Sequence, residues 1–422
     1  MSDVACGARL WSSSDRRPPV RPVALPAAKP PASETRVEIV PRIADVAAAD
    51  WDACANPDPA VFNPFLAHSF LAALEEAGTV GGRTGWTPRH LVLRSECGDV
   101  GGCAPAYLKS HSQGEYVFDH SWADAYTQAG GHYYPKLQIA VPFTPVPGRR
   151  LLARPGPAAA EREAALAAAA AAVVERDGLS GAHITFLTEG EWIRLGHLGY
   201  LQRTDQQFHW RNEDYATFDD FLGSLASRKR KAMRKEREHA LADGLTVEWV
   251  TGRDITEAHW DAFFAFYMDT GSRKWGRPYL NRKFFSLLGA AMPERCLLVM
   301  VKRGGRPIAG ALNMIGGDCL YGRYWGAVEQ HPCLHFEVCY YQAIDFAIQN
   351  KIARVEAGAQ GEHKLARGYL PTKTYSAHFI AHRGLRRAIA DYLQRERVYV
   401  DQAGEQLSEL GPYRKTINVE DE

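Results

Sequence analysis

The feature that most constrains this chain is a motif that occurs twice. One copy runs from Pro64 to Leu74 and the other from Pro278 to Leu288, both with the spacing P-[FY]-L-x3-F-[FL]-x2-L and without a gap. Self-similarity on this scale marks a repeated structural unit. Because the chain has 422 residues, enough for two domains of ordinary size, the repeat predicts two copies of one fold.

The stretches after the two copies keep the same order of features. Each copy leads to a hairpin with a glycine turn, then to a strand that ends in aromatic residues, at Trp122 in the first half and at Tyr324-Trp325 in the second. A long helix and a buried strand come next. A Gly-Glu pair and a Gly-Tyr pair then close each half. So many matches in one order favour a duplication over two unrelated domains with coincidental similarities.

The two halves differ in length. From Pro64 to Gly190 there are 126 residues, whereas from Pro278 to Gly361 there are 83. We expect the additional residues of the first half to lie between Ser110 and Pro157, as an insertion into the shared pattern.

Alternating helical and extended patterns predict an α/β fold, with each half a mixed sheet covered by helices. The expected helices span residues 70–77, 157–177, 256–270, 282–291 and 334–349. The expected strands span residues 90–94, 100–108, 116–122, 144–152, 183–187, 296–302, 307–315, 319–325, 354–357 and 374–380.

The repeat also sets the expected domain boundaries. The first 36 residues are rich in Pro, Ser, Ala and Arg and lack periodicity, which predicts a disordered tail. The predicted parts are this tail (1–36), a first domain (37–215), a basic linker helix (216–244), a second domain (245–396) and a C-terminal tail (397–422).

Charge and composition exclude several classes of protein. A net charge of +1 gives no general attraction to DNA or to a membrane surface. No segment reaches the roughly 18 consecutive apolar residues that a membrane span needs. The eight cysteines have neither zinc-ligand nor paired spacing, so no metal site is expected. We therefore expect a cytoplasmic protein with no DNA partner and no membrane span.

Five stretches of the chain carry a resemblance to a known family. They are SRKRKAMRKERE (227–238), SRKWGRPYL (272–280), LYGRYWGA (320–327), LHFEVCYYQAIDFAI (334–348) and EAGAQGEHKLARGYLPTKTYSAH (356–378). Over residues 38–395 the chain resembles the FemAB-like family of peptidoglycan biosynthesis/recognition proteins and predicted N-acyltransferases. The resemblance implies tandem duplicated GNAT-like domains, the fold of acyl-CoA N-acyltransferases. It also implies transfer of an acyl or aminoacyl group to an amine acceptor, such as a peptidoglycan precursor or another anionic metabolite.

Two departures from related folds bear on the acyl donor. Ordinary acetyltransferases hold the coenzyme A pyrophosphate on the backbone of a [RQ]-x-x-G-x-[GA] loop. Here Gly326 is followed by AVEQHP, and Glu329 would repel a pyrophosphate. Some Fem ligases carry a helical hairpin for tRNA, of which residues 217–243 offer one helix. No tightly bound cofactor is expected, and the donor stays open between acyl-CoA, a carrier-protein thioester and aminoacyl-tRNA. Weak binding of free coenzyme A is predicted, with a larger tRNA or acyl-carrier-protein partner docked on residues 228–237.

Polar residues gather where the buried strand over 354–357 ends in a glycine-rich turn. Ligands of α/β sheets bind just beyond the carboxyl ends of strands. A carboxylate or imidazole there would orient the amine or accept its proton, two cations would hold phosphate or an oxyanion, and a phenol would protonate the leaving group. The alternative is a structural loop with solvated charges. The candidate catalytic residues are Glu356, His363, Lys364, Arg367 and Tyr369.

Three further groups of polar and aromatic residues are candidates for substrate binding. One ends the strand that faces the catalytic turn, one precedes the second copy of the motif, and one lies in the insertion of the first half. For each group the alternative is ordinary packing or a solvated surface. The candidates are Arg323, Tyr324, Trp325, Gln360, His335, Glu337, Arg273, Lys274, Trp275, Asp119, Trp122 and Asp124.

Two basic segments are candidates for anion binding. Arg149 and Arg150 precede the helix that begins near Pro157, where the acetyltransferase fold keeps its anion site. Arg230 and Lys231 lie in the basic run over 228–237, which is equally explained by a solvated helix face.

Three functions of different classes fit these residues. The leading interpretation is an N-acyltransferase. The second is a non-catalytic protein that binds cell-wall precursors in the same pocket. A metal-dependent hydrolase is disfavoured, because the stretch GEHKLARGY lacks the second histidine of H-E-x-x-H.

Overall fold

The strands of the first half correspond in order to the strands of the second half. The protein is described by a computed structural model covering residues 36–274, 278–358 and 361–414. Residues 35–422 form one unit by their contacts. The predicted N-terminal tail lies outside the described residues apart from Arg36.

The second half contains four antiparallel strands followed by one parallel strand. The order is β10-β11-β12-β13-β14, in which β13 and β14 are parallel neighbours and the other neighbouring pairs are antiparallel. Gly304 and Gly305 form the tight turn between the second and third of these strands, both with positive φ. The strands are β10 (Leu245–Thr251), β11 (Cys296–Arg303), β12 (Arg306–Ile315), β13 (Cys319–Ala327) and β14 (Arg354–Glu356).

The first half repeats this order with one break. Pro105 cannot donate to a ladder and interrupts the long strand expected over 100–108. Its first part joins a four-stranded sheet, β1-β3-β4-β7, and its second part joins the sheet of the other half through β6, which runs parallel to β8. The strands are β1 (Arg36–Val40), β2 (Trp86–Pro88), β3 (His90–Arg94), β4 (Val100–Ala104), β5 (Ala106–Lys109), β6 (Lys136–Ile139), β7 (Leu152–Ala153) and β8 (Gly181–Leu187).

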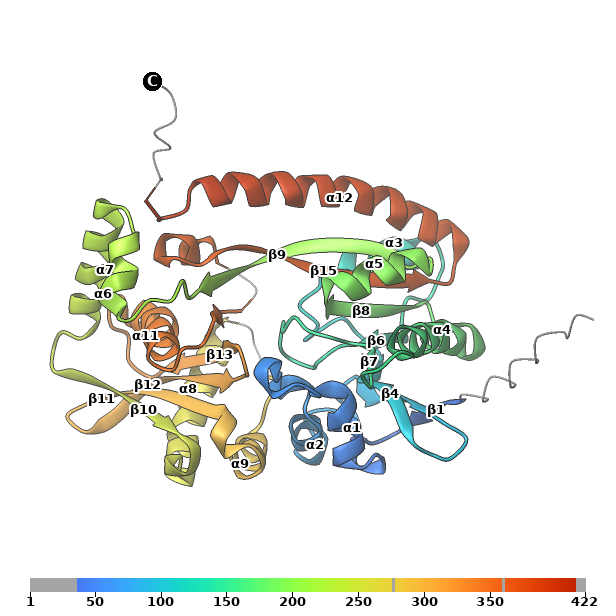
Figure 1. The fold of residues 1–422 in the computed structure, drawn as a ribbon, viewed down its shortest axis with the longest axis horizontal. Coiled ribbons are helices and arrows are strands. Elements are labelled where there is room, and N and C mark those ends of the chain that lie inside the picture. Colours follow the sequence, from blue (N-terminus) through green and yellow to red (C-terminus); the bar gives the residue numbers. More distant parts are fainter. Residues whose placement is uncertain (1–35, 275–277, 359–360, 415–422) are drawn as a thin grey trace, which may run out of the picture. The chain divides into compact units, whose positions relative to one another are not determined.

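The last strand of each half pairs with the other half. Strand β9 (Leu201–Arg211) lies against β14, whereas β15 (Leu370–Ile380) lies against β8. The two exchanged strands are also antiparallel partners of each other, side by side in Figure 1. The result is one eleven-stranded sheet, β10-β11-β12-β13-β14-β9-β15-β8-β6-β5-β2. The predicted domains 37–215 and 245–396 therefore share a sheet.

The exchanged strands fix which residues of the halves correspond. His209 and His378 each lie nine residues after the tyrosine of the Gly-Tyr pair. His209 pairs with Glu356 of β14, and His378 pairs with His183 of β8, so Glu356 and His183 occupy the same position of the repeat.

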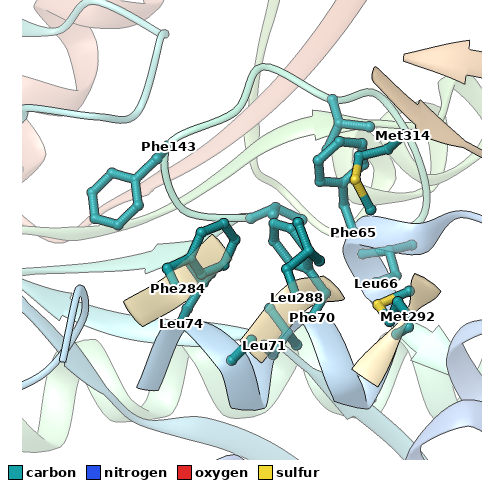
Figure 2. Close-up of a cluster of buried hydrophobic side chains, with 14 of the residues drawn as sticks. Phe65, Leu66, Phe70, Leu71, Leu74, Phe143, Phe284, Leu288, Met292 and Met314 are labelled. Atoms are coloured by element: carbon teal, nitrogen blue, oxygen red, sulfur yellow. The ribbon is translucent and has the colours of Figure 1, made fainter. Parts of the chain in front are cut away.

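The repeated motif forms the seam between the halves. Its helices are α2 (His68–Glu76) and α9 (Arg282–Ala291). Phe70 and Phe284 hold the same position of the motif and meet edge to face, with ring centroids 5.8 Å apart. Figure 2 shows both rings beside Leu74 and Leu288, in an apolar core that contains residues of both halves. The motif is thus kept twice because its two copies pack against each other.

Helices cover both halves. In the second half one helix is interrupted by a π-helical turn, η6 (Glu337–Tyr341), a feature often found at functional sites. Connector η7 (Glu362–Arg367) corresponds in the order of elements to helix α5 (Glu189–His197). The other helices are α1 (Ala48–Ala55), α4 (Ala159–Asp177), α8 (Glu257–Lys274), α10 (Leu334–Phe336) and α11 (Gln342–Gln349).

Each exchanged strand leads into helices. The predicted basic linker contains two, α6 (Phe218–Ser224) and α7 (Ser227–Ala240). After β15 comes α12 (Arg383–Glu409), which lies along β9 and β15 in Figure 1. The boundary predicted at residue 396 falls inside this helix. Among the described residues, no helix has both the length and the apolarity needed to cross a bilayer.

Two expected strands were wrong, and both lie in the insertion. Residues 116–122 were expected to be extended, but Trp122 lies on helix α3 (His120–Gln128), because Asp119 is held by a buried lysine and turns the chain. Of residues 144–152 only Leu152 enters a strand. Prolines at 142, 145 and 147 lack the N–H groups that a ladder requires.

Candidate active site where strands β13 and β14 separate

Strands β13 and β14 pair over only three residues, Cys319–Tyr321 with Arg354–Glu356. Beyond Tyr321, strand β13 remains paired with β12, and a cavity of about 100 Å³ lies beside β13. We call it the small cavity. Its lining residues are Ala311, Asn313, Gly322, Arg323, Tyr324, Trp325, His335, Cys339, Tyr340 and Ala357.

A second cavity, of about 440 Å³, shares Arg323, Tyr324 and Trp325 with the small one, and we call it the main cavity. Both halves build its walls. The insertion contributes Tyr116 and Phe118, among others, and the second half contributes helix α8 and strand β13. The full lining is Ser112, Gln113, Gly114, Tyr116, Phe118, His120, Phe143, Pro145, Tyr267, Thr270, Gly271, Pro278, Tyr279, Arg323, Tyr324, Trp325 and Gly358.

Arg323 and Glu356 form a buried ion pair at the point of separation. Gly322 pairs with Asn313 and Tyr324 with Leu312, so Arg323 is the extra residue of a β-bulge, which re-aims its side chain. Its Nη2 donates to Glu356 Oε2 at 2.8 Å, and both side chains are 1% exposed. Burial alone would raise the pKa of Glu356, but His209, Arg323 and Arg354 hold it below the ordinary value. The predicted base is thus a paired carboxylate.

Lys364 is a buried cation, and of the two predicted catalytic cations it fits a role in catalysis better. Its Nζ donates to the carbonyl of Gly358, a residue of the main cavity wall, at 2.9 Å. Burial, with the charge of Arg323 adding to it, lowers the pKa of Lys364 to about 7. This amine is therefore able to accept or donate a proton near neutral pH.

Arg367 was predicted to hold phosphate or an oxyanion, and in the structure its guanidinium is buried and engaged by neighbouring groups. It donates to both carboxylate oxygens of Glu236 on α7, at 3.1 and 2.8 Å, and to the carbonyl of His363. Its guanidinium also stacks 3.4 Å from the ring centre of Phe336. Tyr341 donates to the same carboxylate. The pair with Glu236 holds η7 against α7, the stacking on Phe336 holds it against α10, and Tyr341 ties η6 to the same carboxylate.

The remaining predicted catalytic residues lie near the site in different surroundings. His363 is exposed, and its Nε2 lies 2.9 Å from the hydroxyl of Tyr340, a residue of the small cavity. Tyr369 is fully buried and donates to the carbonyl of Tyr340 at 3.2 Å. Tyr369 therefore supports the cavity wall from behind.

Of the predicted substrate-binding residues of the second half, four line a cavity. Arg323, Tyr324 and Trp325 line both cavities, and His335 lines the small one against Trp325. Glu337 is fully buried, and Arg237 of α7 and Gln342 donate to it. Glu337 thus joins α7 to the helical segment η6 in which it lies.

Gln360 and Trp275 lie outside the described residues. Arg273 and Lys274 belong to α8, whose described part gives their backbone only.

The insertion lines the main cavity, but through residues other than the predicted Asp119, Trp122 and Asp124. Lys136 donates to Asp119 at 2.5 Å and to Glu115 at 2.7 Å, and all three are buried. Trp122 packs against His378, and Asp124 is exposed. The cavity is lined instead by neighbours of these residues, including Ser112, whose Oγ accepts from Lys136 at 2.8 Å.

The predicted anion site before α4 is closed. Arg150 is fully buried and donates to the carbonyls of Gly148, Arg149 and Val146. Arg149 donates to the carbonyls of Cys54 and Ala153. These guanidiniums cap backbone carbonyls and do not form an open anion site.

Arg230 and Lys231, the predicted anion-binding residues of α7, remain at least partly accessible to solvent. Lys231 is exposed and Arg230 is half-buried. Met233 of this helix is buried, and Glu236 and Arg237 hold the second half through Arg367 and Glu337.

Sequence reasoning missed Asn313, Tyr116, Phe118, Tyr267 and Tyr340, all of which line a cavity. An asparagine inside a predicted strand is a usable signal, because Asn is depleted in strands. The aromatic residues carry no such signal, since core and cavity use the same types. Within the described residues, no group of three His, Cys, Asp or Glu side chains is placed to hold a metal ion.

Comparisons with known proteins bear on the family and the fold of the chain. Residues 42–415 match the FemAB-like family, described as peptidoglycan biosynthesis/recognition. The crystal structure of FemX covers 82% of this chain and 98% of its own, with 14% identity and a TM-score of 0.51. L-PGS from Bacillus licheniformis covers 84% of this chain and 98% of its own, with 10% identity and a TM-score of 0.48. A tandem GNAT protein from the clavulanic acid biosynthesis pathway covers 82% and 98%, with 11% identity and a TM-score of 0.42. No curated protein matches the chain in sequence.

Proposed function

Because the chain belongs to the FemAB-like family of peptidoglycan biosynthesis/recognition proteins, we propose that it transfers an acyl or aminoacyl group to an amine of a peptidoglycan precursor. The family and the duplicated fold are those expected from the sequence, and an enzyme of the transferase class is in keeping with both. The reaction takes place in the main cavity.

One observation carries this proposal. The main cavity ends at Arg323, where two parallel strands separate, and both halves wall it. Its volume of about 440 Å³ lies within the range of small-molecule sites. Amine acylation needs little more than a positioned carbonyl, a deprotonated amine and donors for the developing oxyanion.

The residues at the cavity supply these requirements. The acceptor nitrogen forms a bond to the carbonyl carbon, the bond from that carbon to the carrier oxygen or sulfur breaks, and the proton lost by the amine reaches the leaving group. Arg323 Nε has no hydrogen-bond partner among the described residues and is available to the carbonyl oxygen. Lys364 lies behind Gly358 and lines neither cavity, so with a pKa of about 7 it is suited to take the amine proton only by way of a water molecule beside Gly358.

The acyl donor is proposed to be held by a carrier larger than coenzyme A. Glu329, where a pyrophosphate would lie, is paired with Arg303 at 2.8 Å and with His331 at 3.2 Å. The amides of Leu334 and Phe336, at the start of the next helix, donate to carbonyls of residues 331 and 333. This end of the helix therefore offers few free N–H groups to a phosphate. An aminoacyl-tRNA or a carrier-protein thioester docked on α7 fits better.

The test is a transfer assay read by mass spectrometry. The protein is mixed with the muramoyl-pentapeptide precursor and either bulk aminoacyl-tRNA or a set of acyl-coenzyme A thioesters. We expect a product heavier by one acyl group, formed from the tRNA pool. Arg323→Lys keeps the charge beside Glu356 but moves the donor, and should lower kcat by about 100-fold.

Arg211→Gln is the control, because Arg211 is exposed on β9, the strand that pairs with β14, and lines neither cavity. It should keep transfer close to the wild-type rate. If the precursor binds but no donor is consumed, the protein is a recognition module and the proposed activity is wrong.

A further inference from the structure

A buried asparagine without partners marks the small cavity. Asn313 is fully buried, and neither its amide nitrogen nor its amide oxygen makes a hydrogen bond within the described structure. Buried polar groups are nearly always paired, so an unpaired amide beside a cavity points to a ligand that pairs with it.

The floor of the cavity is kept open by a glycine. Gly322 faces Asn313 across the β12–β13 ladder. A Cβ at Gly322 would lie 3.2 Å from Asn313 Oδ1 and 3.5 Å from the carbonyl oxygen of Glu356. Any side chain there would press on the asparagine amide and fill the floor.

The fold itself does not require this arrangement. Glu356 and His183 correspond, and in the parallel ladders they pair with Tyr321 and Gln138. One residue further along each strand, Gly322 faces Asn313, whereas Ile139 faces Ala106. Both first-half residues are fully buried in an apolar cluster. The same position therefore folds well with two apolar side chains.

Size and charge limit what fits. The cavity volume of about 100 Å³ equals roughly three water molecules at ~30 Å³ each, which suits a group of a few heavy atoms. The guanidinium of Arg323 is already neutralised by Glu356. A neutral group that both donates and accepts a hydrogen bond matches the asparagine amide, whereas a hydrocarbon chain leaves it unpaired.

We propose that the small cavity receives the side chain of the transferred acyl group, and that Asn313 selects a small, neutral, hydrogen-bonding side chain such as a hydroxymethyl or a carboxamide. This inference rests on the proposed function, because it places the donor carbonyl at Arg323, in the wall that both cavities share. Asn313 then pairs with the acyl side chain and discriminates against apolar acyl groups of equal size.

The first test is binding without turnover. Serinamide, alaninamide and leucinamide are titrated into the whole protein by NMR at millimolar concentrations. We expect serinamide to bind at least tenfold more tightly than leucinamide. Asn313→Leu, which matches the shape of Asn, should abolish that preference. A crystal structure in which the cavity holds only ordered water at saturating serinamide would overturn the proposal.

The second test separates a ligand role from a structural one. Asn313→Leu removes an unpaired buried amide, so its Tm should equal or exceed that of the wild type. Asn63 is the matched control, because it is also buried but fully used, accepting from Phe65 N and donating to the carbonyl of Pro147. Asn63→Leu should lower the Tm. An equal loss in both variants would mean that Asn313 holds the fold.

The outcomes remain distinct from those of the transfer assay. Transfer of leucyl or fatty acyl groups at rates equal to seryl would refute the inference and leave the activity standing. Serinamide binding that depends on Asn313, without transfer from any donor, would support the pocket and refute the activity.

Discussion

The two halves share a strand order and differ most where their parallel strands separate. In the second half, Asn313 and Gly322 leave a cavity there. In the first half, Ala106 and Ile139 close the corresponding place with apolar packing. The first half contributes its insertion instead, which walls the main cavity of the second half. The difference shows a duplicated fold in which one copy holds the site and the other encloses it.

Buried charge follows the same division. In the first half, Lys109 and Lys136 with Glu115 and Asp119 form a closed network that fixes the base of the insertion. In the second half, anchoring pairs such as Glu337 with Arg237 are joined by buried charges at the cavity itself, Arg323 with Glu356 and Lys364 behind Gly358. Buried charge at a cavity between separating strands is thus a feature of the second copy.

The largest expected effect is on stability, and it tests whether the two copies of the repeated motif contribute equally where they pack against each other. Phe70→Ala and Phe284→Ala should each cost about 3–5 kcal/mol in the free energy of unfolding, because both rings are fully buried in one core. The rings touch, so the double variant should differ from additivity by about 0.5–3 kcal/mol. Urea unfolding measures both.

Phe118→Ala is the control, since that ring is 56% exposed and should change stability by less than about 0.5 kcal/mol. Strict additivity of the two core variants would contradict the packing of the repeated motif against itself.

The repeat explains why so much of the fold was predictable. A gapless motif and its ordered sequel depend on local spacing, which the sequence displays directly. The exchange of β9 and β15 was not predicted: no strand was expected over 201–211, and the pattern over 374–380 does not state which sheet its strand joins. The strands expected in the insertion failed for a related reason, since Asp119 is placed by a lysine distant in sequence.

The site was predictable in position more than in role. The turn after β14 was expected from the rule on strand ends, and Lys364 lies there with a shifted pKa. The role of Arg367 could not be derived, because its partner Glu236 belongs to the basic helix of the linker. Asn313 was missed because its significance lies in having no partner, which only three-dimensional packing reveals.

The next effect compares the two connectors that precede the exchanged strands. Helix α5 is closed by its own capping box, whereas η7 is held from outside by Glu236 of α7, which accepts from Arg367. Arg367→Ala should therefore cost about 1.5–3 kcal/mol, the range for hydrogen bonds to charged groups, and should lower transfer through a displaced η7. Hydrogen exchange should show lost protection in residues 362–370 and none in α5. Full activity in a variant of unchanged stability would refute both a catalytic and a positioning role for Arg367.

A smaller effect separates the two buried lysines by pH. Burial lowers the pKa of both Lys109 and Lys364 to about 7, well below the ordinary value near ~10.4 of an unfolded lysine. Between these values the unfolded chain binds more protons, so stability should rise with pH, and replacing either lysine by Met should flatten that rise.

Only Lys364 should affect the rate. Transfer by the wild type should increase about fivefold as pH rises from 6 to 7, because the neutral fraction of an amine with a pKa of about 7 grows by that factor. Lys364→Met should lose this increase, and Lys109→Met should retain it. A pH–rate profile altered equally by both variants would contradict the division between anchoring and site.

The smallest effect compares α7 with α12, the helices that follow the two exchanged strands. If a phosphate-bearing carrier docks on α7, Arg230→Gln with Lys231→Gln should weaken the binding of bulk tRNA about twofold to tenfold, because exposed ion contacts are individually weak. Each lost phosphate contact also reduces the salt dependence, so the slope of log K against log salt should fall by roughly 1.5.

Arg387→Gln with Arg395→Gln removes the same charge from exposed positions of α12 and is the matched control. The helix α7 lies against the site helix through Arg237 and Glu337, whereas α12 lies along β9 and β15, so only the first pair should matter. Fluorescence anisotropy from 50 to 300 mM KCl gives both quantities. Equal weakening by the two pairs would reduce the effect to net charge, and the basic run of α7 would then be a solvated face.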